Sequence, residues 1–361
     1  MKMRKIVCSF MISVVCFMTA ISGVSATSYD TSKINAAYSK VVEYYKNNNN
    51  LNNADKILAV ESLGLEAESN QFDTSSADLS STSLSKKIVT EVLLGVDPTE
   101  DKKTLESQID ENGNVEGSWE ASSDVWTLYA LYVTSSEKTN LIANKLNDEL
   151  AASSVCDYEG GGTYYADYDT TGWVIEGLAV VNKEKYATTI NKAIDYIKNN
   201  TTMTTTGWVT ADNVDTQSQV LEGMFAYDTN ALLNDSYTVH PVDCLLNTQL
   251  SDGSFPSGYN AEYTTAEVAK TLGTYKNGSV FEKAKKAYDK MMNPEQPDNT
   301  KPAQPTDTKK DSQSTNKVET TNQKTTSVKT GDETNVVIFV SLSMVSGGLF
   351  LVLRKEYERV H

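Results

Sequence analysis

The chain has 361 residues, and its 48 Asp and Glu outnumber its 32 Lys and Arg, which gives a formal net charge of −16. This excess argues against a nucleic-acid-binding protein, because binding to phosphate backbones requires clustered Lys and Arg. Only two histidines occur, His240 and His361. Imidazole-rich metal sites and most Ser-His-Asp triads are therefore excluded.

Residues 1–26 have the pattern of a secretory signal peptide. Three of the first five residues are basic, an apolar stretch runs from Ile6 to Ile21, and small residues at 24–26 form a cleavage site. We therefore expect an exported protein that loses Cys8 and Cys16 with the signal peptide.

The middle of the chain, residues 27–293, contains a repeat. Four segments align, at 123–131, 170–178, 216–224 and 264–272, and weaker copies occur at 55–64 and 84–95. The fourth positions of the strong copies (Trp126, Trp173, Gln219 and Glu267) are 47, 46 and 48 residues apart. A glycine turn that leads to an aromatic residue, such as Gly162-Thr163-Tyr164, precedes each strong copy. A recurring period of this length is typical of stacked helical units.

The apolar residues of each copy recur at helical spacing, and a small residue (Ala130, Gly177, Gly223 or Thr271) would allow close approach of a neighbouring helix. Amphipathic stretches lie between the copies, at 35–46, 102–109, 141–152, 186–198, 237–249 and 280–291. Six stretches of one kind alternate with six of the other, which predicts an all-α fold of about twelve helices. Strand signals are few.

Residues 294–330 are rich in Pro and Thr and have almost no large apolar residues. Such a composition cannot bury enough surface to fold, so we expect a disordered linker that spans the cell wall.

The last segment, 331–361, contains an apolar run from 336 to 353 that is followed by Arg354 and Lys355. The run is just long enough to cross a bilayer. Together with the preceding Thr330-Gly331, it resembles a Gram-positive sortase signal in which the usual Leu-Pro-x-Thr-Gly survives only as x-Thr-Gly. The resemblance implies attachment to peptidoglycan through Thr330. Without cleavage, the same segment serves as a membrane anchor, and both arrangements place the body on the extracellular surface.

The stretch Gln249-x-x-x-Gly253-x-Phe255 resembles the Gln-Trp motif of the terpenoid cyclases and protein prenyltransferases, with Phe in place of Trp. This resemblance to the prenyltransferase and squalene oxidase repeat implies an α/α toroid of six helical hairpins. The family includes class II cyclases, prenyltransferase β subunits and cobalamin-binding carriers, so the fold alone does not select a function.

The run from Asp167 to Thr171 resembles the Asp-x-Asp-Asp-Thr acid of class II terpene cyclases, with Thr170 in place of the third Asp. The resemblance implies that Asp169 is a proton donor supported by Asp167. The repeat favours a plainer interpretation, because Asp124, Asp169 and Asp215 recur just before each helix. Aspartate oxygens accept hydrogen bonds from the free N–H groups of a first helical turn, so we expect helix N-caps here.

Metal and disulfide chemistry are not expected. The prenyltransferase β subunits bind zinc through Asp, Cys and His, but His240, Asp243 and Cys244 cluster on one outer helix and we expect no metal or other cofactor. The remaining cysteines, Cys156 and Cys244, lie two repeats apart, beyond the ~7 Å Cα separation that a disulfide requires. We expect two buried free thiols.

The fourth repeat position is apolar in two copies and polar in two, which core packing explains poorly. We expect Trp126, Trp173, Gln219 and Glu267 to line the mouth of the toroid and, with Tyr168, to bind a ligand. Many of the 19 tyrosines cluster in turns, and Tyr suits recognition of sugar faces. The favoured hypothesis is therefore a non-catalytic surface protein that binds a small molecule or glycan. The alternatives are a cyclase-like enzyme that uses Asp169 and a scaffold for protein contacts.

Overall fold

The computed structural model describes residues 29–68, 72, 80–118, 120–205, 207–208 and 213–294. All of them belong to one compact unit that ends at Asp298. The expected signal peptide and sorting signal, and all of the expected linker except Pro294, lie outside the described residues.

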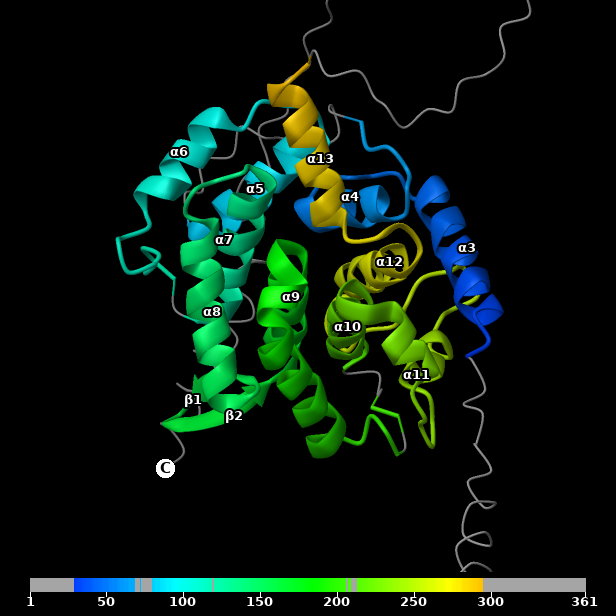
Figure 1. The fold of residues 1–361 in the computed structure, drawn as a ribbon. Coiled ribbons are helices and arrows are strands. Elements are labelled where there is room, and N and C mark those ends of the chain that lie inside the picture. Colours follow the sequence, from blue (N-terminus) through cyan, green and yellow to red (C-terminus); the bar gives the residue numbers. More distant parts are fainter. Residues whose placement is uncertain are drawn as a thin grey trace, which may run out of the picture. The chain divides into compact units, whose positions relative to one another are not determined.

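The described part of the chain is mostly helical, which confirms the predicted helical class (Figure 1). Two of the helices, α9 and α10, are kinked where Asn182 and Asp228 leave the helical conformation. The helices are α3 (Ser32–Asn47), α4 (Ala54–Ser62), α5 (Ser81–Leu93), α6 (Thr99–Ser107), α7 (Ala121–Val133), α8 (Thr139–Ser153), α9 (Tyr168–Asn200), α10 (Val214–Asn234), α11 (Pro241–Leu246), α12 (Ala261–Asn277) and α13 (Val280–Met292).

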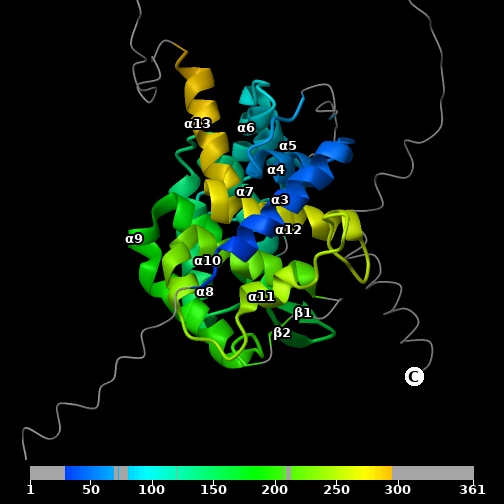
Figure 2. The same cartoon turned by 90° about the vertical axis from the view of Figure 1, so that its right-hand side faces the viewer.

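Six helices carry the six copies of the repeat, namely α4, α5, α7, the first part of α9, α10 and α12, and we call them the repeat helices. Each contacts the next one along the chain, and α12 returns to contact α4. The intervening helices pack on their neighbours: α6 on α5 and α7, α8 on α7 and α9, and α11 on α3 and α10. Helix α13 contacts four repeat helices, α4, α5, α7 and α12 (Figures 1 and 2).

Glycines bring α9 and α10 into backbone contact. A Cβ atom added to Gly223 would lie 2.3 Å from the carbonyl oxygen of Gly172, and one added to Gly172 would lie 2.5 Å from that of Gln219. Only glycine permits so close an approach. The prediction that Gly223 allows a neighbouring helix to approach is confirmed.

The Gln249–Phe255 motif joins a turn to the outer helix α3. The Gln249 Nε2 group donates hydrogen bonds to the carbonyl oxygens of Ala37 (3.0 Å) and Gly253 (3.1 Å). Gly253 has a positive φ of 93°, and a Cβ atom there would lie 2.4 Å from the Lys40 carbonyl oxygen. Phe255 is fully buried. Each motif residue therefore has a structural role at this joint.

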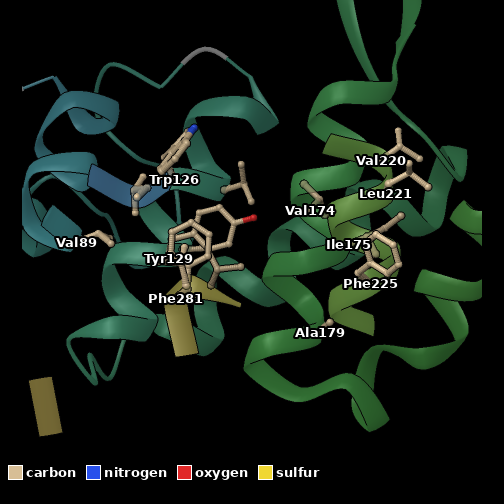
Figure 3. Close-up of a cluster of buried hydrophobic side chains, with 14 of the residues drawn as sticks. Val89, Trp126, Tyr129, Val174, Ile175, Ala179, Val220, Leu221, Phe225 and Phe281 are labelled. Atoms are coloured by element: carbon tan, nitrogen blue, oxygen red, sulfur yellow. The ribbon is translucent and has the colours of Figure 1, made fainter. Parts of the chain in front are cut away.

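The apolar core lies between the repeat helices and α13 (Figure 3). Phe281 of α13 stacks on Tyr129 of α7, with ring centroids 3.6 Å apart and planes within 6°, and Trp126 meets Phe281 edge-on at 6.0 Å. A second group, with Val174, Ile175 and other apolar side chains, packs between α9 and α10. Helix α13 thus inserts an aromatic side chain beside α7.

The prediction of recurring aspartate N-caps is wrong. The caps of α7, α9 and α10 are Glu120, Asp167 and Asn213, because each helix begins earlier than the repeat pattern indicates. Asp124, Asp169 and Asp215 lie inside the first turns.

The glycine turn before α9 belongs to a β-hairpin, made of β1 (Cys156–Gly160) and β2 (Thr163–Asp167). The sequence pattern indicated the turn but not the two strands. Gly161 and Gly162 both have positive φ, as a tight two-residue hairpin turn requires. The strands are antiparallel, and Tyr158 lies opposite Tyr165.

None of the helices in the described ranges is long and apolar enough to cross a membrane. The apolar run at 336–353 lies outside those ranges.

Candidate functional site

The structure brings together the four side chains at the fourth repeat position. The rings of Trp126 and Trp173 are 5.9 Å apart, and Gln219 Nε2 lies 3.3 Å from Glu267 Oε2. Trp126, Gln219 and Glu267 are at most 2% exposed, and Trp173 is partly exposed. These side chains therefore fill the space between the repeat helices. Tyr168 lies apart from them, with its ring edge-on to Trp208 at 4.9 Å.

One helical turn further along, the equivalent positions carry Tyr129, Glu176, Glu222 and Lys270, and all four are fully buried. The Lys270 ammonium lies 3.1 Å from Glu267 Oε2 and 3.5 Å from Glu222 Oε2. We call the eight side chains of these two layers the buried column: Trp126, Tyr129, Trp173, Glu176, Gln219, Glu222, Glu267 and Lys270. The second layer was not predicted from the sequence. The repeat alignment nevertheless indicates it, because its residues lie three positions after the fourth repeat position.

Hydrogen bonds hold the second-layer carboxyls at the edges of the column. Glu176 accepts hydrogen bonds from the hydroxyls of Ser279 (2.7 Å) and Tyr129 (3.2 Å). Glu222 Oε1 accepts one from the Thr274 hydroxyl at 3.3 Å. The column is therefore linked to the start of α13 through Ser279.

The electrostatics of the column favour protonated carboxyl groups beside a charged lysine. Burial raises the pKa of Glu222 well above its usual value and also raises the pKa of Glu176. Burial by itself would lower the pKa of Lys270, but the carboxyls of Glu222, Glu267 and Glu176 together raise it above its usual value. Lys270 is thus held in its charged form.

Several buried polar atoms of the column make no hydrogen bond within the protein. They are Trp173 Nε1, Gln219 Oε1, Glu222 Oε2, Glu267 Oε1 and Lys270 Nζ. Buried polar groups are nearly always paired with protein or ordered water, so this set indicates a polar interior with unused hydrogen-bonding capacity.

The acid candidates lie where α9 begins. Asp167 is the N-cap of α9 and accepts hydrogen bonds from the Thr170 N–H (3.0 Å) and hydroxyl (2.6 Å). Burial raises the pKa of Asp169 to about 7, while a hydrogen bond with Thr216 opposes the rise. Asp215, at the start of α10, accepts a hydrogen bond from the Tyr259 hydroxyl at 2.7 Å. Asp169 is therefore partly protonated at neutral pH.

A pocket of about 710 Å³ lies between the β-hairpin, α8 and the start of α7. Among its lining residues are five with carboxyl groups and one lysine, namely Glu120, Asp124, Glu149, Asp157, Glu159 and Lys145. Lys145 is paired with Asp124 at 2.7 Å. The other four carboxyls give the pocket a negative charge.

Tyr164 of the hairpin is exposed in this pocket, which we call the hairpin pocket, and two more exposed tyrosines lie on the opposite face of the hairpin. Tyr164 lines it and is 69% exposed, while Tyr158 and Tyr165 are 37% and 48% exposed and stack on each other at 5.5 Å. Burial, and then the nearby carboxyl groups, raise the pKa of Glu120, although the Glu159 N–H opposes the rise by donating to it.

The residues weighed as zinc ligands are engaged in other contacts. His240 lies between the rings of Tyr29 (4.2 Å) and Tyr237 (4.9 Å), and its Nδ1 accepts a hydrogen bond from the Val242 N–H. Asp243 accepts hydrogen bonds from the Tyr29 hydroxyl and from Lys33. Within the described ranges, no group of three or more His, Cys, Asp or Glu is arranged to hold a metal ion.

Both cysteines in the described ranges are free, as predicted. Cys156 is buried, and burial raises the pKa of its thiol to about 12. Cys244 is only partly buried, so the prediction of two buried thiols is wrong for this residue. Its helix, α11, is short and lies near the surface of the unit.

Comparison with family models, curated proteins and solved structures finds no match to this chain.

Proposed function

We propose that this chain is an exported, surface-tethered recognition protein that binds an oligosaccharide at the hairpin pocket without catalysing a reaction. Residues 1–26 direct export, 27–293 form the binding domain, 294–330 form a linker, and 331–361 attach the protein to the wall through Thr330 or to the membrane. The acidic composition agrees with a soluble body that does not bind nucleic acid.

We further propose that the binding domain is an α/α toroid. Two observations support this arrangement: the repeat helices contact one another in chain order, and the last of them, α12, contacts the first, α4. Helices α6, α8 and α11 pack on the repeat helices next to them in the chain, as the second helices of hairpins would.

The combination of a polar pocket and exposed tyrosine rings carries the functional proposal. The C–H face of a sugar ring packs on an aromatic ring, and Tyr164 offers such a ring in the pocket. The hydroxyl groups of a sugar donate hydrogen bonds to carboxylates, and Glu149, Asp157 and Glu159 line the pocket. The negative charge favours neutral or amine-bearing sugars and disfavours anionic polymers.

The filled buried column supports binding on this outer surface. Trp126, Gln219 and Glu267 are almost fully buried, so a ligand could reach them only if the repeat helices moved apart. The hairpin pocket requires no such movement.

The test is titration calorimetry of the purified protein with a tetramer of N-acetylglucosamine, the free-amine tetramer and an anionic tetramer. We expect binding of the first or second tetramer and at least tenfold weaker binding after Tyr164→Ala or Glu159→Gln. Leu250→Ala, which changes an exposed apolar side chain on another turn, is the control. Binding that is unchanged by both hairpin substitutions, or absent for all three tetramers, would contradict the proposal.

A protein-contact scaffold is the second candidate, because a column filled by the domain's own side chains leaves no interior ligand site. This candidate predicts that no oligosaccharide binds. It also predicts that a protein partner no longer binds when Tyr158, Tyr164 and Tyr165 are replaced by Ala.

A cyclase-like acid is the third candidate, and the raised pKa of Asp169 supports it. It requires conversion of a polyprene to an isomer of the same mass, which chromatography would detect, and loss of this conversion in Asp169→Asn.

A further inference from the structure

The buried column contains more acidic than basic groups. Glu176, Glu222 and Glu267 are fully buried, and Lys270 is the cation among them. Another lysine, Lys86, lies over the Trp126 ring and is paired with Asp55 at 2.8 Å. If all four column groups were ionised, two negative charges would therefore lack a counter-charge.

Uncompensated charges of this kind are not tolerated in a protein interior. Removal of an ion from water costs several kcal/mol per ion even after relaxation, and a buried carboxylate avoids this cost by taking up a proton. We propose that the buried column binds two protons in the folded protein, at Glu176 and Glu222, and that the domain loses stability as rising pH removes them.

The contacts distinguish the three carboxyls. Glu267 has the shortest contact with Lys270, at 3.1 Å, and also accepts a hydrogen bond from the Gln219 amide, so it is the ion-pair partner of Lys270. Glu176 contacts only hydroxyl groups. Glu222 lies farther from Lys270, at 3.5 Å, and its Oε2 atom accepts no hydrogen bond, so a negative charge on Glu222 is stabilised less than one on Glu267.

The groups that face the column from the surrounding helices add no second counter-charge. The titratable ones are Tyr45 on α3, Asp55 on α4, Lys86 on α5, Asp169 on α9 and Tyr263 on α12, besides Tyr129 in the column itself. Burial raises the pKa of all three tyrosines, so they stay neutral. Asp55 and Lys86 neutralise each other. Asp169 adds a carboxyl group and no cation, so the excess of acid in the column stays uncompensated.

The direction of the pH effect follows from these raised pKa values. A carboxyl whose pKa is higher in the folded than in the unfolded state contributes stability that is complete below about pH 4.5 and is lost as pH rises through its folded pKa. Asp55, Asp235 and Asp243 have lowered pKa values and act oppositely only as pH falls below about 4, and His240, whose pKa burial lowers, acts oppositely as pH falls below about 6.5. Between pH 5 and 9 the column therefore makes stability decrease with pH.

The test compares the full-length protein, in a non-ionic detergent, with its Glu222→Gln and Glu176→Gln variants, since Gln imitates a protonated carboxyl. Unfolding by urea is measured at each half pH unit from 5 to 9. Each substitution removes one proton that only the folded state binds. At pH values between the unfolded-state and folded-state pKa of that group, each pH unit should therefore raise the unfolding constant of the variant about tenfold less than that of the wild type. Glu100→Gln, at a glutamate whose side chain is 85% exposed, should leave the pH dependence between pH 5 and 9 unchanged.

An infrared measurement keeps the test valid if a variant does not fold. The wild-type protein at pH 7 should show a carboxylic-acid C=O band that resists exchange with bulk solvent, and each Gln variant should lose part of it. Equal pH dependence in the wild type and both Gln variants, or no such band in the folded wild type, would overturn the proposal.

Discussion

Gly223→Ala is the substitution for which the structure allows the most specific prediction. The added Cβ atom would lie 2.3 Å from the Gly172 carbonyl oxygen, whereas real Cβ contacts are essentially never shorter than 3.0 Å. The atom in its way belongs to the backbone, so no side chain can rotate aside. Helices α9 and α10 would have to separate by at least about 0.7 Å.

The expected cost follows from two opposing effects. Overpacking a well-packed contact costs about 1–3 kcal/mol, and a backbone clash belongs at the upper end of this range. Replacing Gly by Ala inside a helix contributes about 1 kcal/mol in the opposite direction. We therefore expect Gly223→Ala to lower the free energy of unfolding by about 2 kcal/mol. For a domain of this size the melting temperature would fall by about 4–8 °C.

Gly177→Ala is a matched control, because Gly177 occupies the equivalent position of the preceding repeat. A Cβ atom there would meet the side-chain ends of Leu128 (3.1 Å) and Val125 (3.3 Å), which can shift by a few tenths of an ångström. Its stability should stay within about 1 kcal/mol of the wild type. Urea denaturation followed by tryptophan fluorescence measures both variants. A Gly223→Ala protein as stable as Gly177→Ala would refute the reasoning.

Three further substitutions test other parts of the domain. Lys270→Met removes the cation of the buried column and should lower the free energy of unfolding, measured by urea denaturation, by about 3–5 kcal/mol at pH 7 and by less at pH 5. An equal loss at both pH values would argue against protonation of the carboxyls. Phe281→Ala should cost about 3–5 kcal/mol, because the ring is fully buried against Tyr129, and a loss below 1 kcal/mol would show that α13 is not tightly packed. Asp169→Asn should stabilise the protein, relative to the wild type, more at pH 8 than at pH 5. The stability that the wild type gains from the raised pKa of Asp169 is complete below about pH 4 and is lost as pH rises through about 7, whereas Asn does not titrate. Melting curves of both proteins at the two pH values measure this difference, and the opposite trend would contradict the prediction.

The sequence predicted the helices well because their apolar residues recur with a fixed period. The ranges of α7 and α13 agree closely with the stretches predicted for them, whereas α10 and α12 begin near the predicted residues and continue ten and five residues further. The outer stretch predicted at 237–249 was less accurate, since only Pro241–Leu246 is helical. Pro241 restricts where the helix of that stretch can begin, because its ring fixes φ and it lacks a backbone N–H.

The candidate site was predicted only in part. The repeat alignment correctly indicated that residues 126, 173, 219 and 267 occupy equivalent positions, and the structure brings their side chains together. It could not indicate that these side chains fill the space between the helices, because accessibility depends on how closely the helices approach.

Local patterns in the sequence determined the class and the spacing of the helices, because helix formation depends on residues three and four positions apart. The tertiary structure alone decided which buried groups meet. Glu176, Glu222 and Lys270 are separated by more than 40 residues in the chain, and each by itself resembles an ordinary charged residue on a helix. Only the packing of α9, α10 and α12 encloses three carboxyl groups around one ammonium group, where the cost of buried charge sets their protonation.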